Sequence, residues 1–229
     1  MVPDIDKVLR ATSVIHIGQA HGNAVAITRK LALTALHAHG KLDAAVSLTT
    51  TIGGRTLPGV DVYYKFAADL VDIAVIQLTN EGDHFPDFIG VHFNKIKLAD
   101  PIFVVGLKVD ARDEAAEAVY PCNVNVIEKG EHSAMFQSDY ASFDGLSGAG
   151  VVTRVVNGVT KVVGVHVGSH DATVKHPKIK SSGRELTKRI NLALDSVASS
   201  IHGHHAFCLA CEVARVPDLV DFLRDRGLH

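Results

Sequence analysis

Cysteine is scarce in this sequence, and its three cysteines, Cys122, Cys208 and Cys211, are too few and too odd in number for a disulfide framework. Such sparse cysteine use is typical of a reducing compartment, so we expect a cytoplasmic protein. No stretch approaches the roughly 18 consecutive apolar residues of a membrane span. Residues 1–6 are acidic and lack the apolar core of a signal peptide.

Blocks of like charge are also missing. The 23 Lys and Arg residues and 25 Asp and Glu residues give a formal net charge of -2, and the two signs are interspersed. This distribution predicts no nucleic-acid partner. The 229 residues, 47% of them hydrophobic, suffice for one core or for two small barrels with an appendage. The oligomeric state is left open.

Short apolar runs rich in β-branched residues dominate residues 12–175. Helices of the length that a parallel sheet needs between its strands are missing, and turn signals such as Gly53-Gly54 and Asn157-Gly158 separate the runs. Many short strands at close spacing predict an all-β sandwich or barrel. The expected strands are 13–17, 23–28, 30–35, 44–52, 60–66, 72–78, 101–109, 123–127, 150–156 and 159–167.

The pattern changes after about residue 182, where apolar residues recur at helical spacing from Leu186 to Ile201. The histidine-rich segment 202–205 interrupts it, and a second apolar stretch covers 206–216. Pro217 is suited to open a last short helix, and Gly227 to close it. We therefore expect a helical C-terminal extension.

Three segments carry the chemistry: Leu33–His39, Asp69–Ile76 and Asp144–Val152. A serine hydroxyl attacks a peptide bond only if a neutral imidazole takes its proton, and a buried carboxylate must orient that imidazole. The developing oxyanion needs N–H donors, and the glycines around Leu146 and Ser147 permit a tight turn that presents consecutive amides.

These segments resemble the motifs of chymotrypsin-like serine proteases, Leu-Thr-Ala-Ala-His, Asp-Ile-Ala-Val and Gly-Asp-Ser-Gly-Gly, in the same order. Leu36 and Ala149 depart from that pattern. The resemblance covers residues 12–175. It implies a fold of two antiparallel six-stranded β-barrels, residues 1–98 and 99–182, followed by the α-helical extension 183–229. The residues it implies for catalysis are the triad His37, Asp72 and Ser147, with an oxyanion hole at Gly145, Leu146 and Ser147.

A closer resemblance is to viral 3C-like proteases, including the serine enzymes of arteriviruses and sobemoviruses. Gly164-Val165-His166-Val167-Gly168-Ser169 resembles their Gly-x-His motif, although the hairpin between Ser147 and His166 is longer here. The resemblance implies that His166, Ser142 and Ser169 bind a Glu or Gln side chain before the scissile bond. It also implies that the substrate lies along the strand that contains Val167 and Gly168.

Each assignment has a competitor. His39 and Asp69 are alternatives to His37 and Asp72, Ser147 could be an ordinary turn serine, and His166 an ordinary strand histidine. Cys122 reads as a small buried hydrophobic residue, and 110–117 as a loop or short helix. A zinc site at His202, His204, His205, Cys208 and Cys211 is the weaker interpretation, because the spacing matches no known finger and two cysteines three apart would share one helix face.

The sequence thus predicts a serine endopeptidase that needs no cofactor or metal and acts on a peptide or polyprotein substrate. The resemblance alone implies that it processes a viral polyprotein, in the host-cell cytoplasm. Two alternatives stay open. One is a cellular or bacterial trypsin-like protease of other specificity. The other is a non-catalytic binding module of the same fold.

Overall fold

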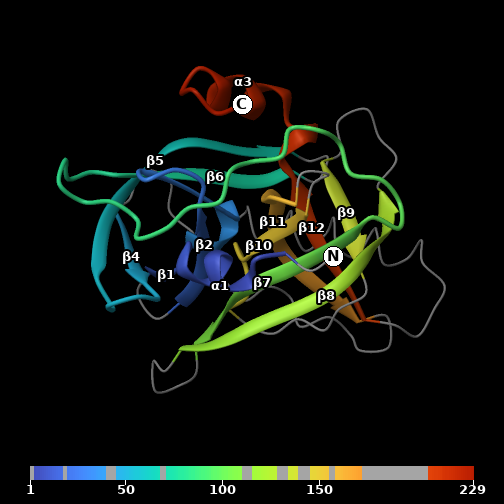
Figure 1. Cartoon of the computed structure of the whole chain (residues 1–229), viewed down its shortest axis with the longest axis horizontal. Helices are drawn as coiled ribbons and strands as arrows, with labels where there is room; N and C mark the ends of the chain where they lie inside the picture. The colour runs from blue at the N-terminus through green and yellow to red at the C-terminus, as the bar shows by residue number, and fades with distance from the viewer. Residues whose placement is uncertain are drawn as a thin grey trace.

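The computed structural model describes residues 3–17, 20–39, 45–67, 71–109, 115–127, 134–138, 145–154, 158–171 and 206–229. β-strands dominate this part of the chain, and they form two six-stranded antiparallel sheets whose strand order closes each into a barrel (Figure 1).

The first barrel has the strand order β1-β2-β3-β6-β5-β4, and β1 also pairs with β4. Gly53 and Gly54, with φ values of +75° and +56°, form the predicted turn between β4 and β5. Only glycine adopts two such values in succession without steric cost, which makes this turn a strong sequence signal. The strands are β1 (Thr12–Ile17), β2 (Ala20–Ala26), β3 (Leu31–Thr34), β4 (Val46–Thr50), β5 (Thr56–Ala67) and β6 (Val71–Leu78).

The second barrel has the strand order β10-β11-β12-β9-β8-β7. Its interior holds a compact apolar cluster that includes Phe136, Ile102 and Leu146. A larger cluster fills the first barrel and continues across the interface into residues such as Leu107 and Val165 of the second. The strands are β7 (Pro101–Val109), β8 (Ala115–Ile127), β9 (Met135–Ser138), β10 (Gly150–Arg154), β11 (Thr160–Asp171) and β12 (Ala206–Glu212).

The expectation that residues 183–229 are helical is wrong for Ala206–Glu212, which form strand β12. This strand extends the second barrel beyond residue 182. It lies between β11 and β9, with Cys211 opposite Val165 and Cys208 opposite Ser138. A short apolar run is compatible with either a strand or a buried helix. Here the run pairs with β9 and β11, each of which would otherwise have an unpaired edge. The helix expected over residues 183–205 lies outside the described residues. Strand β8 likewise begins at Ala115, within the segment expected to be a loop or short helix.

The predicted C-terminal helix forms as α3 (Pro217–Arg224), after a short 3-10 turn, η2 (Val213–Arg215). Pro217 stands in its first turn, and Gly227 follows it with a φ of +80°. The helix packs back onto the first barrel, over β5 and β6 (Figure 1). Phe222 contacts the ring of Tyr63 on β5, with ring centroids 5.2 Å apart. Asp218 accepts hydrogen bonds from Tyr63 and from the Lys65 ammonium group.

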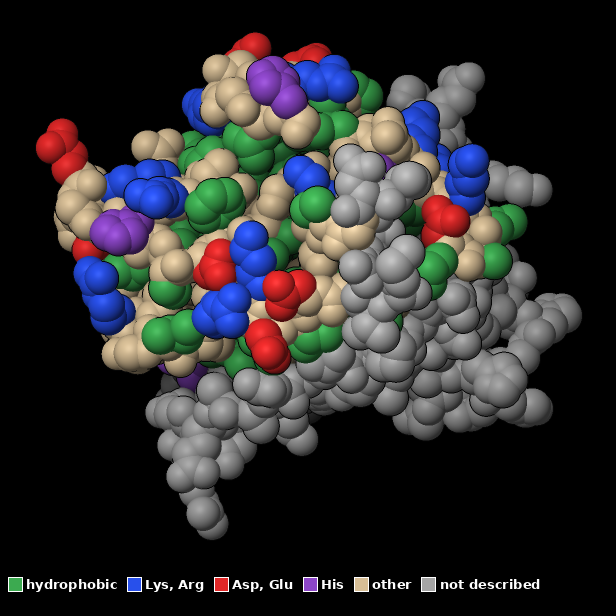
Figure 2. All heavy atoms as spheres, in the orientation of Figure 1, with side chains coloured by type: hydrophobic (Ala, Val, Ile, Leu, Met, Phe, Trp, Pro, Cys, Tyr) green, Lys and Arg blue, Asp and Glu red, His purple; other side chains and the backbone are tan. Residues whose placement is uncertain are grey.

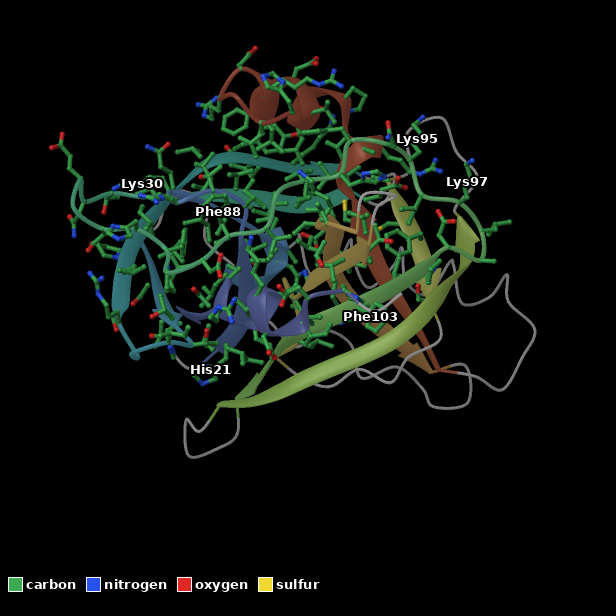
Figure 3. All side chains as sticks on the ribbon, viewed as in Figure 1. His21, Lys30, Phe88, Lys95, Lys97 and Phe103 are labelled. Carbon is green, nitrogen blue, oxygen red and sulfur yellow. The ribbon has the colours of Figure 1, made fainter. Side chains whose placement is uncertain are left out.

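The connecting segment, residues 79–100, crosses from one barrel to the other, and Figure 3 shows its residues Phe88, Lys95 and Lys97 on the near face. The Ile89 N–H group donates to Ala26 of the first barrel at 2.9 Å. The Ile96 N–H group donates to the buried carboxylate of Glu212 on β12 at 2.8 Å. The segment is therefore hydrogen-bonded to both barrels.

Charged side chains of both signs are mixed over the face that Figure 2 shows. An example is the N-terminal helix α1 (Ile5–Arg10), whose Lys7 and Arg10 both approach Asp87 of the connecting segment. No helix within the described ranges is long and apolar enough to cross a membrane.

Candidate active site

His37 lies in η1 (Leu36–His39), a 3-10 turn that directly follows β3. Its neighbours Leu36 and Ala38 are buried, so the apolar sequence around the histidine anchors the turn in the core. The imidazole itself is almost buried, with 4% of its side chain exposed. Packing on both sides thus fixes where the ring can point.

Asp72 lies on β6 and has no exposed surface. Its Oδ2 atom lies 2.5 Å from Nδ1 of His37, and its Oδ1 atom accepts a hydrogen bond from the backbone N–H of His37 at 3.1 Å. A buried carboxylate is costly unless its oxygens are paired, and here one residue pairs both. The contact assigns the ring proton to Nδ1 and leaves a lone pair on Nε2.

Ser147 comes from the second barrel, in the turn before β10. Its Oγ atom lies 2.7 Å from Nε2 of His37, the nitrogen that carries the lone pair. A second contact, to the carbonyl oxygen of Val167, is long at 3.4 Å, so the hydroxyl proton points to the imidazole. The structure therefore joins the three predicted residues, which are far apart in sequence, in one hydrogen-bonded series.

The turn that carries Ser147 needs its glycines. Gly145 and Gly148 have φ values of +92° and +84°, which other residues rarely adopt. The side chain of Leu146 is fully buried in the second-barrel core, so it anchors the turn and does not line a cleft. Within the part of the chain that the structure describes, no hydrogen bond engages the N–H groups of Gly145 and Ser147. Two free amides beside the Ser147 hydroxyl match the needs of an oxyanion hole.

Strand β11 runs beside this turn. The Gly148 N–H donates to the His166 carbonyl, and the His166 N–H donates to the Ala149 carbonyl, both at 2.8 Å. The side chain of Val167 is buried, and Gly168 has none, so only their backbone is available to a substrate. The strand bulges between His166 and Gly168.

His166 is 1% exposed, and its environment keeps it neutral. Burial, with a smaller contribution from the nearby His37, lowers its pKa to about 3. A neutral imidazole donates one hydrogen bond and accepts one. The side chain can therefore offer an N–H group to an uncharged or anionic partner without itself carrying charge.

Burial also determines the chemistry of Cys211, which is fully buried near Asp72. Burial, the largest effect, and the charges of Asp72 and Glu212 raise the pKa of the thiol to about 12, although a hydrogen bond with the Asp72 backbone lowers it. Cys211 is therefore a protonated, apolar core residue.

Several predicted site residues are not covered. Ser142 and Asp69 lie outside the described residues, as do His202, His204 and His205 of the zinc interpretation. The side chains of Ser169, His39, Cys122 and Cys208 are likewise outside the description. Among the side chains that are described, no three His, Cys, Asp or Glu residues group closely enough to hold a metal ion.

Sequence reasoning missed two buried polar residues, Asn23 and Ser138. Asn23 lies on β2 and bonds to the Ser147 turn, and Ser138 lies at the end of β9. The only signal for Asn23 is one amide side chain within an otherwise apolar run, at a position that the strand buries. Ser138 carries no signal, because one of its two partner strands, β12, was expected to be helical.

No protein-family model matches this chain, and no curated protein matches it. Solved structures do match. The human pathogenic astrovirus serine protease aligns at 15% identity and a TM-score of 0.55, over 90% of each chain. The inactive form of the Rv3671c protease from M. tuberculosis reaches a TM-score of 0.60 at 12% identity, over 99% of this chain and 97% of that one. The MamO protease domain from Magnetospirillum magneticum aligns at a TM-score of 0.57 and 15% identity, over 93% of this chain and 96% of that one. The chain therefore has the fold of chymotrypsin-like serine proteases.

Proposed function

We propose that this protein is a serine endopeptidase with His37, Asp72 and Ser147 as its catalytic triad. The observation that carries the proposal is the continuous series Asp72 Oδ2, His37 Nδ1, His37 Nε2 and Ser147 Oγ, with contacts of 2.5 and 2.7 Å. The fold that the chain shares with serine proteases supports it.

In the proposed reaction, His37 Nε2 takes the hydroxyl proton as Ser147 Oγ bonds to the scissile carbonyl carbon. The N–H groups of Gly145 and Ser147 hold the resulting oxyanion. The C–N bond breaks, and the imidazolium returns its proton to the departing amine. Water then attacks the acyl-enzyme, with His37 again as base, and releases the acid and the free serine. Asp72 keeps the imidazole oriented and stabilises its charged form.

A serine-reactive fluorophosphonate probe tests this proposal. Wild type is expected to be labelled at Ser147 and to cleave peptides. Ser147→Ala is expected to lose both while keeping the wild-type circular dichroism spectrum and melting temperature. Labelling of wild type at another residue, or full cleavage by Ser147→Ala, would reject the assignment.

The specificity is a separate part of the proposal. His166, with Ser142 and Ser169, would form the pocket for a Glu or Gln side chain before the scissile bond, and the substrate would add as a strand along β11. Its support is a buried, neutral imidazole on the strand whose Val167 carbonyl approaches Ser147. A polar group of this kind favours a side chain that can hydrogen-bond to it over an apolar one.

A cleavage profile on a peptide library measures that specificity. Preference for Glu or Gln is the expected result, and preference for Arg or a large apolar residue would overturn it. His166→Ala is expected to reduce cleavage after Glu or Gln far more than labelling by a small fluorophosphonate. Equal loss of both would argue against a pocket role. Viral polyprotein processing in the host cytoplasm is the biological setting that we propose, and it rests on the motif resemblance.

A further inference from the structure

We propose that Asn23 is the positioning residue that holds the oxyanion-hole turn of the second barrel in its active form. The inference rests on the proposed function and adds a residue of the first barrel to it. Asn23 is fully buried on β2, and its side-chain Nδ2 donates to the carbonyl of Gly145 at 2.7 Å. Its backbone N–H donates to the carbonyl of Ser147, also at 2.7 Å.

The amide of Asn23 is held on both sides. Besides its bond to Gly145, Nδ2 donates to the Leu107 carbonyl at 3.0 Å, and Oδ1 accepts from the Leu107 N–H at 2.7 Å. Leu107 lies on β7 of the second barrel. A planar group with three hydrogen bonds has one orientation, so the donor that faces Gly145 is preorganised.

The carbonyls that Asn23 holds belong to the residues whose N–H groups would bind the oxyanion. Gly145 lacks a side chain and can adopt φ values of either sign, so its conformation needs an external restraint. Fixing the carbonyls of Gly145 and Ser147 toward β2 restricts rotation of the turn and leaves both N–H groups unengaged. Preorganisation of this kind avoids reorganisation at the moment of reaction.

The approach of the turn to β2 is tight. A side-chain carbon added to Gly148 would lie 1.9 Å from the Asn23 carbonyl oxygen. The same oxygen accepts a hydrogen bond from Thr34 Oγ1 at 2.7 Å, which fixes it from the other side. The first barrel thus supplies a rigid surface against which the turn docks.

The test is Asn23→Asp, which keeps the shape and the acceptor for Leu107 N–H but removes both donors. Thr12→Val is the matched control, because Thr12 is a fully buried first-barrel residue whose hydroxyl bonds to Val8, away from the turn. We expect Asn23→Asp to lower kcat about 100-fold with KM changed less than about threefold, as loss of an oxyanion donor does. Affinity for a peptide aldehyde should fall by a similar factor. Thr12→Val should lower the melting temperature and leave these quantities unchanged.

Unchanged aldehyde affinity in Asn23→Asp, or equal losses in the control, would overturn the proposal. Amide hydrogen exchange gives a readout that needs no catalysis. The N–H groups of Gly148 and Ala149, which are hydrogen-bonded in this turn, should lose protection in Asn23→Asp alone. If that variant does not fold, Asn23→Ser, which withdraws the donor from Gly145, takes its place. A wild type that fails to react with fluorophosphonate would reject the protease proposal. Hydrogen exchange at Gly148 and Ala149 tests the role of Asn23 independently of that result.

A different observation concerns specificity. Ser138 is 1% exposed, and among the described residues its hydroxyl has no hydrogen-bond partner. A buried hydroxyl without a partner is destabilising, so its presence calls for an explanation such as a ligand.

The sheet register relates Ser138 on β9 to His166 on β11, with β12 between their strands. Phe136 lies opposite Ala210, which lies opposite His166. Both Phe136 and Ala210 belong to the second-barrel core. Ser138 is two residues beyond Phe136 and therefore on the same face, in the next row of the sheet. That row continues through Cys208 to Ser169.

We propose that Ser138 forms the inner end of the His166 pocket and donates its hydroxyl to the terminal oxygen of a substrate Glu or Gln side chain. This inference rests on the proposed specificity. The test is Ser138→Ala, assayed on paired peptides that carry Gln or the similarly sized apolar norleucine before the scissile bond.

The ratio of kcat/KM for Gln over norleucine is expected to fall about tenfold in Ser138→Ala, in line with the loss of one hydrogen bond. The melting temperature should stay equal or rise, because the variant loses only an unpaired hydroxyl. Thr12→Val, which loses a paired hydroxyl, should melt lower with an unchanged ratio. An unchanged ratio in Ser138→Ala, with wild-type cleavage after Gln intact, would overturn the pocket role and leave the protease proposal standing.

Discussion

Asp72 contacts His37 twice, with Oδ2 2.5 Å from the ring nitrogen Nδ1 and Oδ1 3.1 Å from the backbone N–H. The double contact fixes both the tautomer of the ring and its position relative to the turn. An orienting carboxylate needs both of these properties.

Asp72→Asn is expected to preserve the backbone contact and to impose the wrong tautomer on His37, because an amide can donate to Nδ1. We expect kcat to fall on the order of 10⁴-fold with little change in melting temperature. Steady-state kinetics on a cleaved peptide measure this. Asp87→Asn is the control and should keep wild-type kcat, because Asp87 contacts Lys7 and Arg10 of α1 and the Phe88 N–H, and none of these belongs to the triad. A loss below about tenfold in Asp72→Asn would contradict the orienting role.

His166 predicts a dependence of stability on pH. Its pKa falls from 6.5 in the unfolded chain to about 3 in the fold. The unfolded state therefore binds the proton first, and the contribution of this group to stability is present above pH 6.5 and is lost as the pH falls toward 3. The slope for one group is at most about 1.4 kcal/mol per pH unit.

Urea unfolding of wild type and His166→Gln between pH 3 and 7 measures that slope. The variant should lose less stability than wild type over this range, by the contribution of one titrating group. His84→Gln, at an exposed position, should follow wild type. Parallel curves for wild type and His166→Gln would show that the imidazole is not held neutral.

In the C-terminal helix, we expect the loss of a buried apolar side chain to lower the free energy of unfolding more than the loss of an exposed charge. Leu223 lies on the buried face of α3 and is fully buried, so Leu223→Ala should lower the free energy of unfolding by about 2–5 kcal/mol. Asp218→Asn weakens an exposed ion pair with Lys65 and should cost less than about 1 kcal/mol. Chemical denaturation of both variants tests this, and a larger loss for Asp218→Asn would contradict it.

Cys211 is expected to resist alkylation. Burial raises the pKa of its thiol to about 12, so little thiolate forms at pH 8. Iodoacetamide treatment of the folded protein, followed by mass spectrometry of the peptide that contains Cys211, should find it unmodified. The same treatment in urea should modify it fully, and rapid reaction of the folded protein would show that the site is open.

Local sequence patterns predicted most of the strands and turns, because a strand's apolar alternation and a glycine turn depend on residues close together in the sequence. His37, Asp72 and Ser147 could be selected by their motifs, and the structure brings them together. The strand Ala206–Glu212 could not be identified, because a short apolar run takes the conformation that its neighbours offer. Asn23 could not be assigned a role either, because its side chain bonds to residues 84 and 122 positions away.

The segment between the barrels has a mechanical consequence. Ile89 is hydrogen-bonded to Ala26 and Ile96 to Glu212, so the connecting segment bonds to the first barrel at its middle and to the second barrel near its end. A hinge motion that separated the nucleophile from its base would have to rupture these bonds or the Asn23 contacts. If the proposed function is right, the catalytic groups are in place before substrate arrives, and we expect that domain closure does not gate turnover.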